Sequence, residues 1–392
     1  MRRLDRATCL LAITMSVGSR APAAAAESSE RVAIRGELGA EYDDNVHRAE
    51  VLSGAVEPPR VGSPVTRAVL GLTSTAALSH GQDVAFSLLG AGKLFLASAA
   101  RSENVLVVDT AGSWRITTDR RGKLGLSATY YEAAQNVTPA ERALSGEARD
   151  FRSIVPTLRV LRYLSSGDSL TLGAGFRSFV YKAQRDYDFQ APVFTVEYRL
   201  ARETADGVAD WEMTASTSLE LRRFAGERLV SNPTGCAAGS CLPVVDPTGA
   251  HHVDQFLTAQ AEVTRTGRLL VGAGYAIQWN RSNSLFESLV RHIGAVRLTA
   301  PLPFGLYLAA RAELVFVTYP DKLTLATSVA GQPITSIEEE SRSHLRAELS
   351  RDLTGHLQLM ARYSYYANAL GQSAGDYRRQ TATVSLVYSS TD

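Results

Sequence analysis

Long hydrophobic runs, an excess charge of either sign, and cysteine are all scarce in this sequence of 392 residues. Beyond the N-terminal region no apolar stretch approaches the roughly 20 residues that a membrane-spanning helix needs, which excludes a helical membrane protein. Lysine and arginine number 41 against 40 aspartate and glutamate, a formal net charge of +1. Nucleic-acid binding would call for a clustered basic excess, so we expect no nucleic-acid partner.

Linkers are lacking as well. A soluble chain of this length would usually divide into two domains. No stretch rich in proline, glycine and serine breaks the sequence, and its composition does not shift along the chain. One large closed sheet would explain why the chain has no such boundary.

The N-terminus has the layout of a secretory signal peptide. Three arginines precede an apolar run at 7–17, and small residues at 21–26 offer cleavage sites. This arrangement is typical of an export signal. We therefore expect a signal peptide over residues 1–26 and a single domain over residues 27–392.

Three cysteines are present, and export would remove Cys9 with the signal. Cys236 and Cys241 then remain as a pair, at the two ends of a segment of six residues. Exported proteins meet an oxidising compartment, so we expect a disulfide between Cys236 and Cys241 in an extracellular loop. Two unpaired thiols remain the alternative, because short loops can strain a disulfide.

The segment 380–388, close to the C-terminus, alternates strictly between two kinds of residue. Ala382, Val384, Leu386 and Tyr388 share one face, and threonines and a serine occupy the other. A period of two with one apolar face is the pattern of a β-strand. An apolar outer face, a polar inner face and an aromatic at the boundary are typical of the closing strand of a membrane β-barrel.

The same alternation recurs along the whole chain and predicts about sixteen strands, within a range of 14–18. The predicted strands are 31–41, 66–78, 84–96, 104–118, 124–131, 151–164, 170–181, 192–201, 211–222, 255–264, 269–279, 289–300, 305–318, 343–350, 356–366 and 380–388. Short and long connections alternate between them. Outer-membrane barrels have short periplasmic turns and longer extracellular loops, and an even strand count would place both termini in the periplasm. The sequence therefore predicts an all-β, antiparallel transmembrane barrel.

Large aromatic residues sit near the ends of predicted strands. Trp114, Trp211, Trp279 and Tyr388 all fall on the apolar face. Aromatic girdles mark the two membrane interfaces of such barrels, and we assign these four residues to them.

Charged residues recur on the opposite, polar face. Because charged side chains are costly in lipid, they must point to water or to each other, and a barrel of this size encloses an aqueous lumen. Facing charges could set a field across the pore or only solvate its wall. The expected lumen-lining residues are Arg35, Glu37, Asp109, Arg115, Arg159, Arg177, Glu197, Arg199, Glu220, Arg291, Arg297, Arg311, Glu313, Arg346, Glu348, Arg362 and Arg379. Basic residues outnumber acids near mid-strand, which predicts a weak preference for anions.

Catalytic chemistry finds little support in the sequence. Asp186 and Asp188 lie near the extracellular mouth, as do His252 and Asp254 in a neighbouring hairpin. Paired carboxylates and a histidine could activate water there, which keeps a surface hydrolase as a third alternative. No metal-binding motif and no phosphate-binding glycine loop occurs, so we expect no enzyme activity, no metal and no cofactor. His292 falls on an apolar strand face.

The end of the first predicted strand resembles a segment of a known protein family. The segment 36–48, GELGAEYDDNVHR, resembles the opening of the β-barrel porin 2 family, in which Tyr-Asp-(Asp/Ser)-Asn-Val often marks the exit of strand one. The family belongs to Gram-negative outer membranes, and several members are encoded with exopolysaccharide export systems. The resemblance implies a porin-like barrel, with polysaccharide secretion as a further expectation.

Three functions follow as hypotheses. A channel for hydrophilic solutes or secreted polysaccharide agrees best with charges spread over most strands. A structural or adhesive barrel would have a plugged lumen and act through the connections 226–251 and 319–340. The expected partners are outer-membrane lipids, the barrel-assembly machinery and, through the resemblance, periplasmic polysaccharide-export components.

Overall fold

The structure is a computed structural model of the whole chain. It describes residues 31–46, 51–52, 60–79, 81–135, 150–165, 167–182, 185–203, 209–237, 240–285, 287–320, 343–367, 370–371, 375–376 and 378–390.

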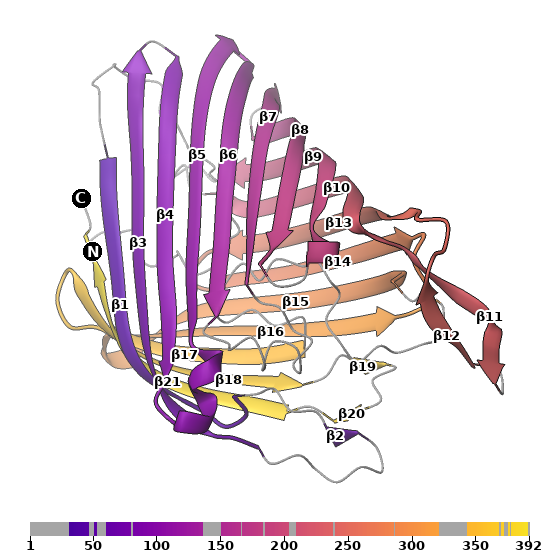
Figure 1. Cartoon of the computed structure of the whole chain (residues 1–392). Helices are drawn as coiled ribbons and strands as arrows, with labels where there is room; N and C mark the ends of the chain where they lie inside the picture. The colour runs from indigo at the N-terminus through magenta and orange to yellow at the C-terminus, as the bar shows by residue number, and fades with distance from the viewer. Residues whose placement is uncertain are drawn as a thin grey trace.

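Within these residues, sixteen long strands form one closed antiparallel barrel (Figure 1). Each strand pairs with its sequence neighbours, and the sheet closes where β1 pairs with β21. The barrel strands are β1 (Arg31–Asp43), β3 (Ser63–Ser79), β4 (Gln82–Phe95), β5 (Val105–Asp119), β6 (Gly122–Gln135), β7 (Phe151–Ser165), β8 (Asp168–Tyr181), β9 (Phe189–Glu203), β10 (Ala209–Glu227), β13 (His251–Thr266), β14 (Leu270–Ser282), β15 (Leu289–Leu302), β16 (Leu306–Thr318), β17 (Ser343–Asp352), β18 (Leu357–Ala367) and β21 (Arg378–Ser389).

Closure gives every strand a hydrogen-bonding partner on both sides. β1 pairs with β3 along its whole length and with β21 from Arg35 to Asp43. A barrel has no free sheet edge, so the backbone satisfies its own donors and acceptors. The predicted strand count and fold class are confirmed.

Connections of two lengths alternate around the barrel, which gives it two unlike ends. One end carries tight turns such as the one between β7 and β8, and we call it the short-turn end; the other, the long-loop end, carries the longer connections, such as those that follow β10 and β16. Gly167 shows why glycine occupies a tight turn. Its φ is 92°, and a Cβ there would lie 2.1 Å from the carbonyl oxygen of Ala201.

Several small elements accompany the barrel. A hairpin of β11 (Leu229–Ala237) and β12 (Ser240–Val245) projects beyond the barrel wall in Figure 1. The others are β2 (Val51–Leu52), β19 (Leu370–Gly371), β20 (Gly375–Asp376), η1 (Ser98–Glu103), η2 (Arg185–Tyr187) and η3 (Pro303–Gly305). No helix within the described ranges is long and apolar enough to cross a membrane.

Most strands extend beyond their predicted ends, and the largest extensions lie at the long-loop end. The prediction ended one strand at 222, whereas β10 continues to Glu227; it began the next at 255, whereas β13 begins at His251. Here the backbone ladder continues after the apolar alternation has ended. Ladder hydrogen bonds need no particular side chain, so hydrophobic periodicity does not reveal these extensions.

Candidate functional site: the inner wall of the barrel

The two faces of the sheet differ sharply in exposure. Leu38, Leu70 and Val384 are more than half exposed, whereas Glu37 and Arg67, on the opposite face, are 8% and 3% exposed. Side chains that point into a closed barrel converge and cover one another, while those that point outward diverge. The apolar face is therefore the outer face, and we call the opposite one the inner face.

Strand alternation places all seventeen predicted lumen-lining residues on this inner face. On β16, for example, Leu314 and Phe316 are exposed outward, so Arg311 and Glu313 point inward. The same alternation holds on β15, where Val296 is 56% exposed beside Arg297. Whether these residues line an open, water-filled channel stays a prediction.

Ion pairs tie the inner face together across neighbouring strands. Arg67 on β3 contacts Glu37 on β1 at 3.0 Å, and Lys93 on β4 contacts Glu41 at 2.8 Å. Arg67 and Lys93 were missing from the predicted set. The outward alternation of their strands, with Ala68 and Leu70 on the apolar face, was the signal that could have found Arg67.

Ion pairs continue around the wall, and they divide the predicted arginines into those with a carboxylate partner and those without one. Arg362 contacts Glu348 at 2.8 Å, Arg177 contacts Glu220 at 3.2 Å and Arg115 contacts Asp83 at 2.5 Å. Each such pair cancels much of its own field, so less positive field reaches the lumen than the arginine count suggests. In the described part of the chain, Arg159 on β7 has no carboxylate partner.

The segment Tyr42–Val46, which carries the family resemblance, joins the first strand to the last. Arg379 on β21 donates to both carboxylate oxygens of Asp43, with Nε–O distances of 3.0 and 3.1 Å and an Nη2–Oδ2 distance of 2.5 Å. The carboxylate also accepts the backbone N–H of Asn45 at 3.0 Å. Asp43 is fully buried, and Arg379 is 4% exposed.

The next three residues lie at the same junction between β1 and β21, which we call the seam. Asp44 accepts the backbone N–H of Gln380 at 2.6 Å, and the side-chain amide of Asn45 donates to the carbonyl of Arg378 at 3.0 Å. Val46 is 1% exposed and packs in a small apolar cluster at the long-loop end. Three residues of the motif, Asp43, Asp44 and Asn45, thus connect the first strand to the last.

A stack of aromatic rings covers another part of the inner face at the long-loop end. Phe179 lies 4.9 Å from both Phe151 and Phe189 between ring centroids, and Phe224 lies 4.0 Å from His252. The rings are nearly parallel in these three contacts and are buried. Because the ring faces pack against each other, the stack stabilises the wall. It also occupies space on the inner side of the barrel.

One arginine is enclosed by this aromatic region. Arg222 is 2% exposed, with its guanidinium 4.0 Å from the ring centroid of Phe256 and 5.1 Å from that of Phe189. Its Nε donates to Glu220 at 2.9 Å. Glu220 therefore contacts both Arg222 and Arg177. The guanidinium of Arg222 is held by this carboxylate and by two ring faces.

The residues of the hydrolase hypothesis converge only in part. His252 contacts Asp254 at 2.7 Å and Ser282 at 3.0 Å, both through Nε2. Asp188 instead accepts the backbone N–H of Tyr181 at 2.6 Å, and neither Asp186 nor Asp188 hydrogen-bonds to His252 within the described part of the chain. Of the four residues that the hypothesis names, only His252 and Asp254 hydrogen-bond to each other within the described ranges.

Further polar groups fix the cluster in place. Asn280 is 2% exposed and donates to Asp254 at 3.0 Å and to the backbone carbonyl of Glu287 at 2.8 Å. Burial raises the pKa of Glu287, which lies in the connection between β14 and β15. These contacts bind that connection to β13 and β14, which is a structural role. Across the described ranges, no group of three potential metal ligands occurs.

On the outer face, the predicted interface aromatics are all exposed. Trp114, Trp211, Trp279 and Tyr388 are 38%, 49%, 42% and 46% exposed. The guanidinium of Arg265 lies 5.5 Å from the Trp211 ring centroid. A cation–π contact of this kind suits a headgroup layer. Their contact with lipid stays a prediction.

His292, on the outer face of β15, has a partner that the sequence did not reveal. The hydroxyl of Tyr275 on β14 lies 2.6 Å from its Nδ1. The two residues are not direct cross-strand partners, because Tyr275 pairs with Gly294 and His292 with Ile277. A diagonal hydrogen bond of this kind depends on the register of the sheet.

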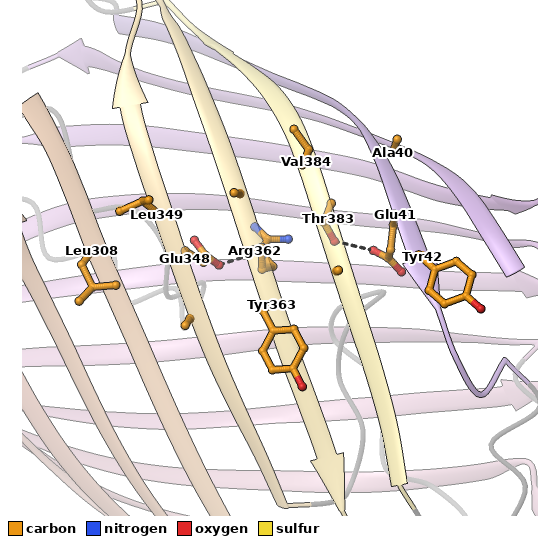
Figure 2. A pocket seen from close by; sticks show the side chains of 13 residues that line it. Ala40, Glu41, Tyr42, Leu308, Glu348, Leu349, Arg362, Tyr363, Thr383 and Val384 are labelled. Carbon is orange, nitrogen blue, oxygen red and sulfur yellow. Dashed lines mark hydrogen bonds and ion pairs between the residues drawn. The ribbon is translucent and has the colours of Figure 1, made fainter. Parts of the chain in front are cut away.

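A shallow hollow of about 560 Å³ lies on the outer face across β1, β21, β18, β17 and β16 (Figure 2). Four alanines line it together with larger side chains, among them Leu308, Leu349 and Tyr363. The ion pair Glu348–Arg362 lies just beneath, on the inner side. A hollow with this lining faces hydrocarbon if the apolar outer face of the barrel is embedded in a membrane.

The cysteine pair lies on the projecting hairpin. The backbone register places Cys236 on β11 opposite Cys241 on β12. Their side chains lie outside the described part of the structure, so the disulfide stays a prediction. The backbone pairing is compatible with it, because a disulfide needs Cα atoms about 4.4–6.8 Å apart.

Comparison with known proteins supports the architecture. No family model and no curated protein matches the sequence. The high-pH structure of Pseudomonas putida OprB matches with a TM-score of 0.50 and 10% identity over 92% of this chain and 94% of that chain. The fold is that of an outer-membrane β-barrel. Vibrio cholerae OmpT, described as outer-membrane expressed, covers 93% of this chain and 99% of its own at 10% identity, with a TM-score of 0.45. Acinetobacter baumannii OccAB1 covers 92% and 97% at 10% identity, with a TM-score of 0.44. A shared barrel fold does not by itself distinguish a channel from an enzyme.

Proposed function

We propose that this protein is an outer-membrane channel that carries hydrophilic solutes or a secreted polysaccharide. The observation that carries the proposal is the sorting of side chains between the two faces of a closed barrel. Large apolar residues are exposed on the outside, and charged residues gather inside. Because charge inside a membrane requires water or a counter-charge, this sorting favours a hydrated lumen inside a lipid-embedded wall.

The remaining expectations form part of the same proposal. A signal peptide over residues 1–26 would export the chain, and the barrel-assembly machinery would insert it. The termini and the short-turn end would lie in the periplasm. The Tyr42–Val46 segment supports kinship with the β-barrel porin 2 family, and through it an association with periplasmic polysaccharide-export components.

Heat-modifiable migration tests membrane insertion, because a folded barrel and a boiled chain run differently in detergent gels. Single-channel recording in planar bilayers tests the pore. We expect discrete currents with a weak anion preference that fades as salt rises, since screening shortens to about 10 Å at 0.1 M. Well-folded protein without current would refute the channel.

A plugged structural barrel is the second candidate, and the aromatic stack on the inner face is the observation that favours it. Buried rings on β7, β8 and β9 occupy the inner side near the long-loop end. Solute entry distinguishes the two functions. Liposomes that contain the protein should swell in an isosmotic sugar solution if the lumen is open, and should not if it is filled.

A further inference from the structure

Two arginines lie on the outer face of the barrel at the long-loop end, where its apolar surface stops. Arg223 follows Leu221 by two positions on β10, and Arg281 follows Trp279 by two positions on β14. Leu221 and Trp279 are 39% and 42% exposed on the outer face. Because side chains two positions apart on a strand share a face, both arginines point outward, and both are exposed. We call Arg223 and Arg281 the arginine pair.

The arginine pair flanks a single strand. The register places Arg223 opposite Val253 on β13, and Arg281 opposite Gln255 on the same strand. The three strands β10, β13 and β14 lie side by side (Figure 1). Two strand spacings and an offset of two residues put the two backbone positions about 12 Å apart. Arginine side chains are long enough for both guanidinium groups to reach one small group between them.

This chain supplies the arginine pair with no counter-charge. Among the described residues, neither side chain makes an ion pair or a hydrogen bond. Val253 and Gln255, which lie between the two arginines on the outer face, are uncharged. Along the outer face of β10 the nearest acid is Glu227, four residues beyond Arg223. Its carboxylate is directed toward the next connection, where a Cβ at Gly249 would lie 3.6 Å from Oε1.

Other outer-face cations near the strand ends have a carboxylate partner. The pairs are Arg162–Asp119 at 2.6 Å, Arg202–Asp168 at 2.9 Å and Lys182–Glu132 at 2.8 Å. The arginine pair differs from them because it presents two positive charges on neighbouring strands without an acid from the described residues. It is therefore open to an anion from outside the chain.

We propose that the arginine pair binds the phosphate group of a lipid headgroup, and this proposal rests on the membrane placement in the proposed function. An unpaired cation is costly in hydrocarbon and favourable beside anionic headgroups. Guanidinium forks hold phosphate oxygens in pairs. Leu221 and Trp279 lie next to the arginines on the side of the apolar surface, so the acyl chains of the same lipid would pack against them. Free phosphate has the same headgroup chemistry but lacks these chains.

Quenching of Trp279 fluorescence provides a local test. The chain has three tryptophans, so Trp114→Phe and Trp211→Phe leave Trp279 as the single one. The full chain is folded into phosphatidylcholine vesicles that contain either brominated phosphatidic acid or brominated phosphatidylcholine. Brominated chains quench tryptophan only at close range. We expect stronger quenching by brominated phosphatidic acid, because its phosphate holds its chains beside Trp279.

Substitutions in the same background locate the site. Arg223→Gln and Arg281→Gln should each lower the relative binding constant of phosphatidic acid roughly fivefold, the equivalent of about 1 kcal/mol for one arginine at an anionic lipid surface. The double variant should be quenched equally by the two lipids. The matched control is Arg351→Gln at the short-turn end. Arg351 is exposed and follows Leu349 by two positions on the outer face of β17. Its removal should change the binding constant less than about twofold.

The outcomes separate this site from the membrane placement, and none of them depends on an open pore. Equal quenching of the parent protein by the two lipids overturns the site while the membrane placement stands. An equal loss in Arg351→Gln also overturns it, because general surface charge would then explain the preference. Inorganic phosphate should relieve the quenching no more than potassium chloride of equal ionic strength; greater relief would assign the site to free phosphate and overturn the lipid. Absence of quenching by either lipid refutes the membrane placement, and the site with it.

Discussion

Removal of the Asp43 carboxylate should destabilise the barrel more than removal of most other acids. Asp43 ends the first strand, and Arg379 lies at the beginning of the last, so the pair spans the seam at which the sheet closes. The substitution Asp43→Ala leaves Arg379 in place and takes away a carboxylate that makes three close contacts with it.

The magnitude follows from burial. Both side chains are 5% exposed or less, so little water can replace the lost partner. Breaking a buried ion pair from one side costs about 3–5 kcal/mol, chiefly because the remaining charge is left uncompensated. Replacing both partners by apolar residues is often neutral. Asp43→Leu combined with Arg379→Met should therefore recover much of the stability lost in Asp43→Ala.

An exposed pair supplies the matched control. Arg162 and Asp119 are in contact at 2.6 Å near a short turn, but their side chains are 50% and 51% exposed. Solvent-exposed pairs contribute little to stability, so Asp119→Ala should change the free energy of unfolding far less than Asp43→Ala does.

Equilibrium unfolding by urea in lipid vesicles, followed by tryptophan fluorescence, measures the three variants and the wild type. A loss below about 1 kcal/mol for Asp43→Ala would show that the seam pair carries little stability. A double variant as unstable as Asp43→Ala would show that an uncompensated charge is not the cause. Either result refutes the reasoning.

Two further predictions concern the loops. Cys236 and Cys241 should appear as one disulfide-linked species in mass spectra of non-reduced peptides, and two alkylatable thiols on freshly isolated protein would contradict this. Asp246 accepts the N–H of Thr248 at 2.9 Å and a guanidinium hydrogen bond from Arg228 at 2.6 Å, and these contacts lower its pKa. Because the pKa of Asp246 is lower in the folded chain than in the unfolded chain, its carboxylate stabilises the fold at pH values above the unfolded pKa of about 3.9. This stabilisation is lost as the pH falls through the folded-state pKa. Hydrogen exchange in residues 244–250 should therefore quicken only below about pH 4, and Asp246→Asn should remove this dependence.

Much of the fold followed from local chemistry. Two-residue periodicity located the sixteen strands, because alternating polar and apolar residues suit only a backbone that turns each successive side chain to the opposite face. The same alternation placed Arg311 and Glu313 on one face and Leu314 on the other. The tight turn at Gly167, where glycine is needed, was visible in the sequence. Strand ends such as that of β10 were missed, because ladder hydrogen bonds leave no trace in the side-chain pattern.

Partnership between strands was decided only by the tertiary structure. The sequence placed Arg297, Arg311 and Arg346 on the inner face, but their direct opposition depends on the register of three strands, which includes a pairing across the long connection 319–342. Closure likewise brought Asp43 to Arg379, 336 residues away. Periodicity fixes the face on which a side chain lies, whereas register and barrel closure fix its neighbours, and those are set jointly by all the strands.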